Sequence, residues 1–99
     1  MIERIPIACS LEGDQAKRRW QAWNALMEQR LGADRSAQHL TVRFTGDDEV
    51  RANLVDLVTA ERECCNFVDW ELEDRGQELT LTIRGDANGV AAMSEAFGV

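Results

Sequence analysis

The fold is decided by the stretch FVDWELEDRGQELTLTI, which spans residues 67–83. Apolar and polar residues alternate over 67–73 and again over 79–83, which is the period of a strand with one buried face. Residues 74–77, DRGQ, separate the two runs and have the composition of a tight turn. The stretch therefore predicts a β-hairpin. The residues expected on its buried face are Val68, Trp70, Leu72, Leu79, Leu81 and Ile83.

Periodic segments on both sides of the hairpin predict further elements. Working outward, we expect helices over 48–65, over 11–31 and from residue 85 onward, and strands over 39–45 and 5–9. The helix over 11–31 is expected to start after Ser10 as N-cap and to stop at Gly32. Its apolar stripe consists of Ala16, Trp20, Trp23, Met27 and Leu31.

The predicted order of elements is β-α-β-α-β-β-α. We expect one domain over residues 1–99, of the α/β (α+β) class, with a four-stranded mixed sheet and helices packed on one face. The first two strands of this arrangement run parallel through a right-handed crossover, and the last two form the hairpin. Pro6 favours an edge position for the strand over 5–9.

Charge and composition limit the partners that we expect. The chain of 99 residues has 18 acidic and 11 basic residues and a net charge of -7, so nucleic acid is not an expected partner. The apolar run at residues 5–8 is too short for a secretory signal, and no apolar stretch approaches the roughly 18 residues of a membrane span. We therefore expect a cytoplasmic protein that does not enter the membrane. In a reducing compartment, its cysteines indicate metal binding, redox chemistry or core packing before a disulfide framework.

The end of the helix over 48–65 carries the residues best suited to chemistry. On a helical wheel, Glu61 falls near the middle of the apolar arc, with Cys64 and Cys65 each within roughly 60° of it. Burying a carboxylate without a partner costs several kcal/mol, so Glu61 needs an arginine, an amide, a metal or a proton. Cys9 lies on the apolar face of the strand over 5–9, so three thiols and a carboxylate could converge. The arc itself is defined by Val50, Leu54, Leu57 and Val58.

Three thiolates favour a thiophilic ion. Soft sulfur ligands select soft ions, and three sulfurs suit mercury(II), arsenic(III) or copper(I). A zinc site prefers four ligands with Cys-x(2–4)-Cys spacing, which the adjacent Cys64 and Cys65 do not have. His39 is expected on the strand face opposite the core, away from such a site.

Structural interpretations of the same residues stay open. Free cysteine is among the most buried residue types, so a helix that ends in two cysteines can simply be packed. Glu61 can form a structural salt bridge with an arginine such as Arg43 or Arg18. Trp20, Trp23 and Trp70 are expected in the core or at its rim, and not as a ligand cage.

From Cys9 to the strand over 79–83, the chain resembles a family of small, poorly characterised bacterial proteins. Its members carry Cys-Ser/Thr-Leu near the start and Glu-Arg-x-Cys-Cys-x-Phe at a helix end, and they are associated with heavy-metal and mercury resistance contexts. Asn66 stands where members often have proline. The resemblance implies ligand roles for Cys9, Cys64 and Cys65, with Glu61 beside them. The matching segments are Ala8-Cys9-Ser10-Leu11, Arg19 with Trp23, the strand Leu40-Thr41-Val42-Arg43-Phe44, and ERECCNF over 61–67.

Three functions fit these observations. The first is a soluble binding protein that holds a thiophilic metal or metalloid ion through Cys9, Cys64 and Cys65. The second is a small thiol-dependent enzyme that cleaves a carbon–metal bond, with Glu61 as the catalytic proton donor. The third is a non-catalytic interaction module with structural cysteines, in which an exposed sheet face forms a homodimer.

Overall fold

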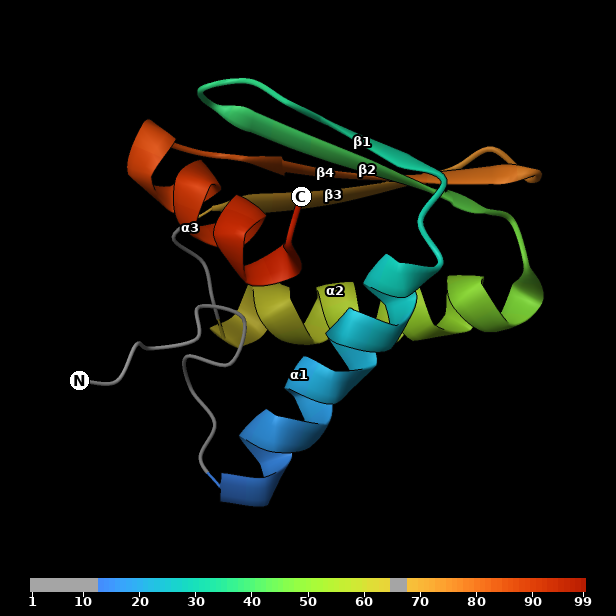
Figure 1. Ribbon diagram of the computed structural model, residues 1–99. Coiled ribbons are helices and arrows are strands. Elements are labelled where there is room, and N and C mark those ends of the chain that lie inside the picture. Colours follow the sequence, from blue (N-terminus) through green and yellow to red (C-terminus); the bar gives the residue numbers. More distant parts are fainter. Residues whose placement is uncertain (1–12, 65–67) are drawn as a thin grey trace.

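The computed structural model describes residues 13–64 and 68–99, and in them the chain alternates helices with the strands of one sheet (Figure 1). The elements of these residues are α1 (Gly13–Glu28), β1 (Gly32–Arg35), β2 (His39–Thr45), α2 (Asp48–Cys64), β3 (Asp69–Asp74), β4 (Glu78–Arg84) and α3 (Ala87–Phe97). The predicted strand over 5–9 and its Pro6, the Ser10 cap and Cys65 lie outside the described residues.

The described strands form one sheet in the order β1-β2-β4-β3, and each neighbouring pair is antiparallel. The hairpin predicted over 67–83 is confirmed, with Trp70 opposite Ile83 and Leu72 opposite Leu81. The fold is therefore α+β, as expected, with a four-stranded sheet within the described part of the chain. The mixed sheet is not confirmed, because the long strand β2 pairs antiparallel with β4 and with β1.

Strand β1 has no counterpart in the prediction. Helix α1 ends at Glu28, and the amide of Leu31 donates to the carbonyl of Arg43 at 2.7 Å, which places the chain alongside β2. Leu31 is therefore 55% exposed and does not extend the apolar stripe of the helix. Gly32 begins β1 and does not cap α1; a Cβ there would lie 2.3 Å from Nη2 of Arg43, the end of a flexible side chain.

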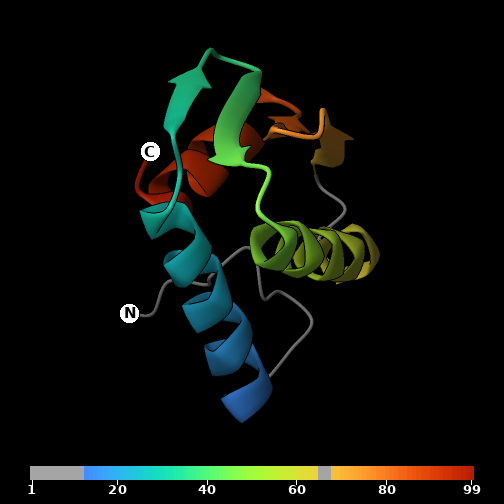
Figure 2. The same ribbon diagram turned by 90° about the vertical axis from the view of Figure 1, so that its right-hand side faces the viewer.

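All three described helices cover the same face of the sheet, as Figures 1 and 2 show. The strands alternate accordingly: Leu40, Val42 and Phe44 of β2 are buried, whereas the residues between them face away from the helices. The core residues contributed by the helices are Trp23, Leu26, Met27, Val50, Leu54, Val58, Val90, Met93 and Phe97. No helix among the described residues is long and apolar enough to cross a membrane.

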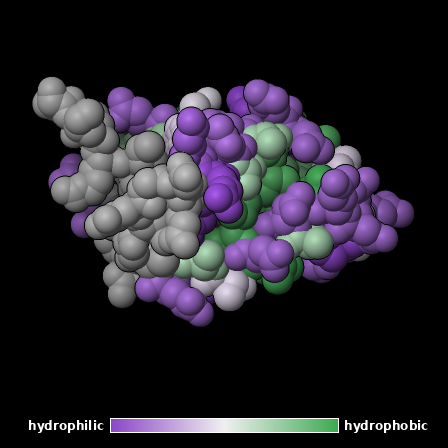
Figure 3. All heavy atoms as spheres, turned by 90° about the horizontal axis from the view of Figure 1, so that it is seen from below, coloured by the Kyte–Doolittle hydropathy of each residue, from purple (hydrophilic) through white to green (hydrophobic). Residues whose placement is uncertain are grey.

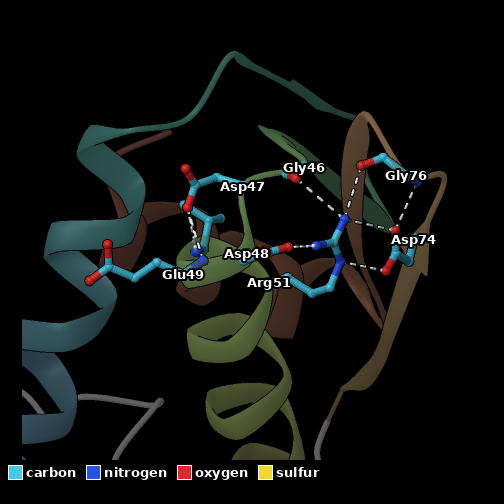
Figure 4. Close-up of polar contacts among 8 residues, drawn as sticks. Gly46, Asp47, Asp48, Glu49, Arg51, Asp74 and Gly76 are labelled. Carbon is cyan, nitrogen blue, oxygen red and sulfur yellow. Dashed lines mark hydrogen bonds and ion pairs between the residues drawn. The ribbon is translucent and has the colours of Figure 1, made fainter.

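The first turn of α2 is fastened to the β3–β4 turn by Arg51 (Figure 4). Its Nε donates to Oδ2 of Asp74 at 2.7 Å, and Nη1 donates to Oδ1 of Asp48 at 2.8 Å. Its Nη2 donates to the carbonyls of Gly46 at 3.3 Å and Gly76 at 2.9 Å. One guanidinium thus joins the start of the helix to the hairpin, which fixes the direction in which α2 crosses the sheet.

The Arg51–Asp74 ion pair predicts a pH-dependent stability. The hydrogen bond from Arg51, and then the Gly76 amide, hold the pKa of Asp74 below its ordinary value of 3.8. A lowered pKa in the folded state stabilises the protein above the unfolded pKa, and this contribution is lost as the pH falls through the folded pKa. Asp74→Asn should therefore lower the urea midpoint at pH 7, and the difference from the parent protein should shrink towards pH 2.

Asp69→Asn is the matched control, because Asp69 is exposed on the same strand and no ion pair joins it to another described residue. This variant should shift the midpoint less than Asp74→Asn does at pH 7. Equal midpoints for the parent protein and Asp74→Asn at pH 7 would show that the pair does not contribute to stability.

Candidate functional site

Glu61 lies at the centre of the core, as the helical wheel predicted. Its side chain is 0% exposed, and it projects from the last turns of α2 towards α1. Oε2 accepts a hydrogen bond from Nη1 of Arg19 at 3.2 Å and another from Nε1 of Trp23 at 3.0 Å. The buried carboxylate therefore joins the two helices.

The arginine that pairs with Glu61 is not one of those proposed from the sequence. Arg43 belongs to β2 but faces away from the helices, where its guanidinium lies against Gly32. Arg18 is exposed on α1. Arg19 is the partner instead, and its side chain is only 10% exposed.

The spacing of Arg19 and Trp23 is the signal that could have identified this contact. Residues four apart in a helix lie on the same side, one turn from each other. Trp23 is 0% exposed, so Arg19 on the same side is directed towards the core and not towards solvent. An arginine placed one turn before a buried tryptophan therefore marks where a buried carboxylate can be satisfied.

Helix α2 is also fastened to the sheet at this end. Nε and Nη2 of Arg62 both donate to the carbonyl oxygen of Trp70 in β3, at 3.1 and 2.9 Å. Neighbouring residues of the last turns thus contact different elements, since Glu61 binds α1 and Arg62 binds β3. The two contacts restrict both the rotation and the tilt of the helix end.

Aromatic residues pack beneath this helix end and are part of the core. The ring centroid of Trp23 lies 5.8 Å from that of Trp70 and 4.9 Å from that of Phe97, within the usual range for aromatic pairs. Trp70 and Phe97 are each 5% exposed, and Trp20 is partly buried against the same cluster. The expectation that the tryptophans belong to the core or its rim is therefore confirmed.

His39 is exposed at the start of β2, as expected, and its Nδ1 lies 3.1 Å from Oγ of Ser36.

A separate shallow hollow of about 230 Å³ lies between α1 and α2, on the lower side of the molecule, where Figure 3 shows hydrophobic side chains bordered by hydrophilic ones. Among its described lining residues only Asp56 is charged. The lining residues are Ala22, Ala25, Leu26, Gln29, Asn53, Asp56 and Leu57.

Of the three candidate thiol ligands, the structure places the backbone of one. Cys64 is the last residue of α2, so its position lies one helical turn beyond Glu61 on the same side. Cys9 and Cys65 lie outside the described residues. Within the described part of the chain, no three histidine, cysteine, aspartate or glutamate side chains group in a way that could hold a metal.

Replacing Glu61 with glutamine should destabilise the fold. Glutamine keeps the shape but removes the negative charge that the mostly buried guanidinium of Arg19 contacts, which we expect to cost about 2–4 kcal/mol in the free energy of unfolding. Urea denaturation at pH 7 measures this cost. Glu63→Gln removes an exposed carboxylate from the same turn and should change stability by less than about 0.5 kcal/mol. Equal losses in the two variants would contradict a stabilising role for the buried pair.

The end of α2 therefore has a buried ion pair with α1, a contact with β3 and, as its last residue, Cys64. This arrangement is suited to holding groups in place beyond the last turn of α2. Known proteins add no ligand set to it: no family model matches the chain, and no curated protein matches it.

Proposed function

We propose that the chain binds a thiophilic metal or metalloid ion through the thiolates of Cys9, Cys64 and Cys65. The observation that supports this most is the buried contact of Glu61 with Arg19 and Trp23, one turn before Cys64. Ligands bind an ion tightly only when supporting contacts hold them near the geometry of the complex. Cys64 is the last residue of the helix end that is held in this way, and Cys65 follows it in the sequence.

The ligand chemistry limits the ion to a small class. Thiolate sulfur is soft and selects soft ions, and binding requires that each cysteine gives up its proton. Mercury(II), arsenic(III) and copper(I) all accept three sulfur ligands. The adjacent pair Cys64-Cys65 lacks the Cys-x(2–4)-Cys spacing of structural zinc sites. The family resemblance of the two cysteine motifs favours the same class of ions.

The contacts of Glu61 support binding over cleavage of a carbon–metal bond. A proton donor must carry a proton on its carboxyl group before it acts. Oε2 instead accepts hydrogen bonds from a guanidinium and from an indole N–H of α1, and the side chain is 0% exposed. Glu61 is therefore better suited to positioning the helix end than to protonating a leaving carbon. An enzymatic role has no comparable support among the described contacts.

Titration of the reduced protein tests this function. We expect mercury(II) or arsenite to bind at one ion per chain, with thiolate charge-transfer absorption and proton release. The double variant Cys64→Ser with Cys65→Ser should lose this absorption. Glu61→Gln keeps all three cysteines, and it should keep the stoichiometry while the affinity falls by about 10–100-fold, as expected when a supporting contact is removed.

Two controls make the titration decisive. Circular dichroism at each titrated concentration checks that the variants are folded, and Glu63→Gln, with an exposed carboxylate near the same helix end, should bind like the parent protein. If the parent protein shows no stoichiometric binding signal, the proposal is refuted. Unchanged affinity in the double cysteine variant would refute it equally.

A further inference from the structure

A second feature beside the end of α2 is an open hollow of about 460 Å³ at the β3 edge of the sheet. Two of its lining residues, Arg62 and Val68, stand immediately before and after the segment that contains Cys64 and Cys65. The hollow therefore adjoins the proposed ion site along the chain on both sides. Its described lining residues are Arg62, Val68, Asp69, Trp70, Glu71 and Arg84.

The charges around the hollow are of both signs and are held in place. Arg62 donates to the carbonyl of Trp70, which carries no net charge. No ion pair joins Arg62 to another residue in the described part of the chain. Arg84 pairs with Glu71, and Asp69 lies opposite Arg84 in the sheet register. Guanidinium and carboxylate groups in one hollow suit a ligand that carries both carboxylate and ammonium groups.

We propose that this hollow docks the small zwitterionic thiol that delivers the ion, an inference that rests on the proposed function. A thiophilic ion in a thiol-rich solution is carried as a complex with small thiolates, so a binding protein must take it by ligand exchange. In each step one protein cysteine forms a bond to the ion and one carrier thiolate leaves. The leaving thiolate takes up the proton that the cysteine released, and no electrons are transferred. Docking the charged groups of the carrier would hold the complex at the end of α2 while the exchange takes place.

The docking step can be tested without any ion, using S-methylglutathione, whose sulfur can neither ligate as a thiolate nor form a disulfide. Titration into the ¹⁵N-labelled protein should give saturable amide shifts at Val68–Glu71 and Arg84, with a Kd of about 1 mM. Arg62→Gln keeps a donor for the Trp70 carbonyl but removes the charge, and it should weaken binding about tenfold.

Arg30→Gln is the matched control, because Arg30 also donates to a backbone carbonyl, that of Met27 at 2.7 Å, and lies beside β1 at the opposite edge of the sheet. This variant should bind S-methylglutathione like the parent protein. If the peptide gives no saturable shifts, or if Arg30→Gln weakens binding as much as Arg62→Gln, the docking inference is wrong.

The delivery step has its own measurement. Mercury(II) offered as its bis(glutathione) complex should transfer to the parent protein about tenfold faster than mercury(II) offered as its bis(2-mercaptoethanol) complex, which lacks charged groups. Arg62→Gln should bring this ratio close to one. A ratio near one in the parent protein would overturn delivery through the hollow. Failure of the proposed function is visible separately, as a flat titration with mercury(II) in the absence of any carrier.

Discussion

The buried carboxylate of Glu61 is the interaction on which the arrangement of the helices depends. A carboxylate with 0% exposure is tolerated only when its oxygens are paired, and Oε2 takes donors from two residues of α1. A hydrophobic contact between the same helices would tolerate small rotations and slips. The pair of donors, a guanidinium and an indole N–H, fixes one rotation and one axial position of α1 against α2. This directional contact is what an apolar residue at position 61 would not provide, even if it stabilised the fold equally well.

Arginines hold α2 at both of its ends, and their partners differ in how exposed to solvent they are. At the start, Arg51 binds carboxylates and carbonyls of exposed turns, where solvent weakens each contact. At the other end, Arg19 binds a fully buried carboxylate and Arg62 binds the carbonyl of Trp70. The contacts next to Cys64 are thus the less solvated ones.

Periodicity allowed most of the fold to be predicted, and its failures have physical causes. The alternation in β2, β3 and β4 is strong because one face packs against helices, so these strands and their hairpin were predicted within a few residues. Strand β1 was missed because Gly32–Arg35 is short and has little apolar content, and because Leu31 was assigned to the helix although its amide bonds to the carbonyl of Arg43. The wheel predicted the burial of Glu61, because direction around a helix depends on position alone. It could not identify Arg19 as the partner, because the partner depends on how α1 lies against α2.

The net negative charge of the chain makes the positive charge of the arginines near the end of α2 relevant to ligand approach. A net charge of -7 attracts cations over long distances but repels the anionic complexes that thiophilic ions form with small thiols of net negative charge. Local positive charge must offset this repulsion wherever such a complex is to approach. Arg62, two residues before Cys64 in the sequence, supplies positive charge at this end of α2. Its hydrogen bonds go to the carbonyl of Trp70, which does not neutralise that charge. An aspartate or glutamate in place of the Trp70 carbonyl would have held the arginine more strongly and neutralised it. A neutral anchor therefore fixes the helix end without adding a further negative charge beside Asp69 and Glu71.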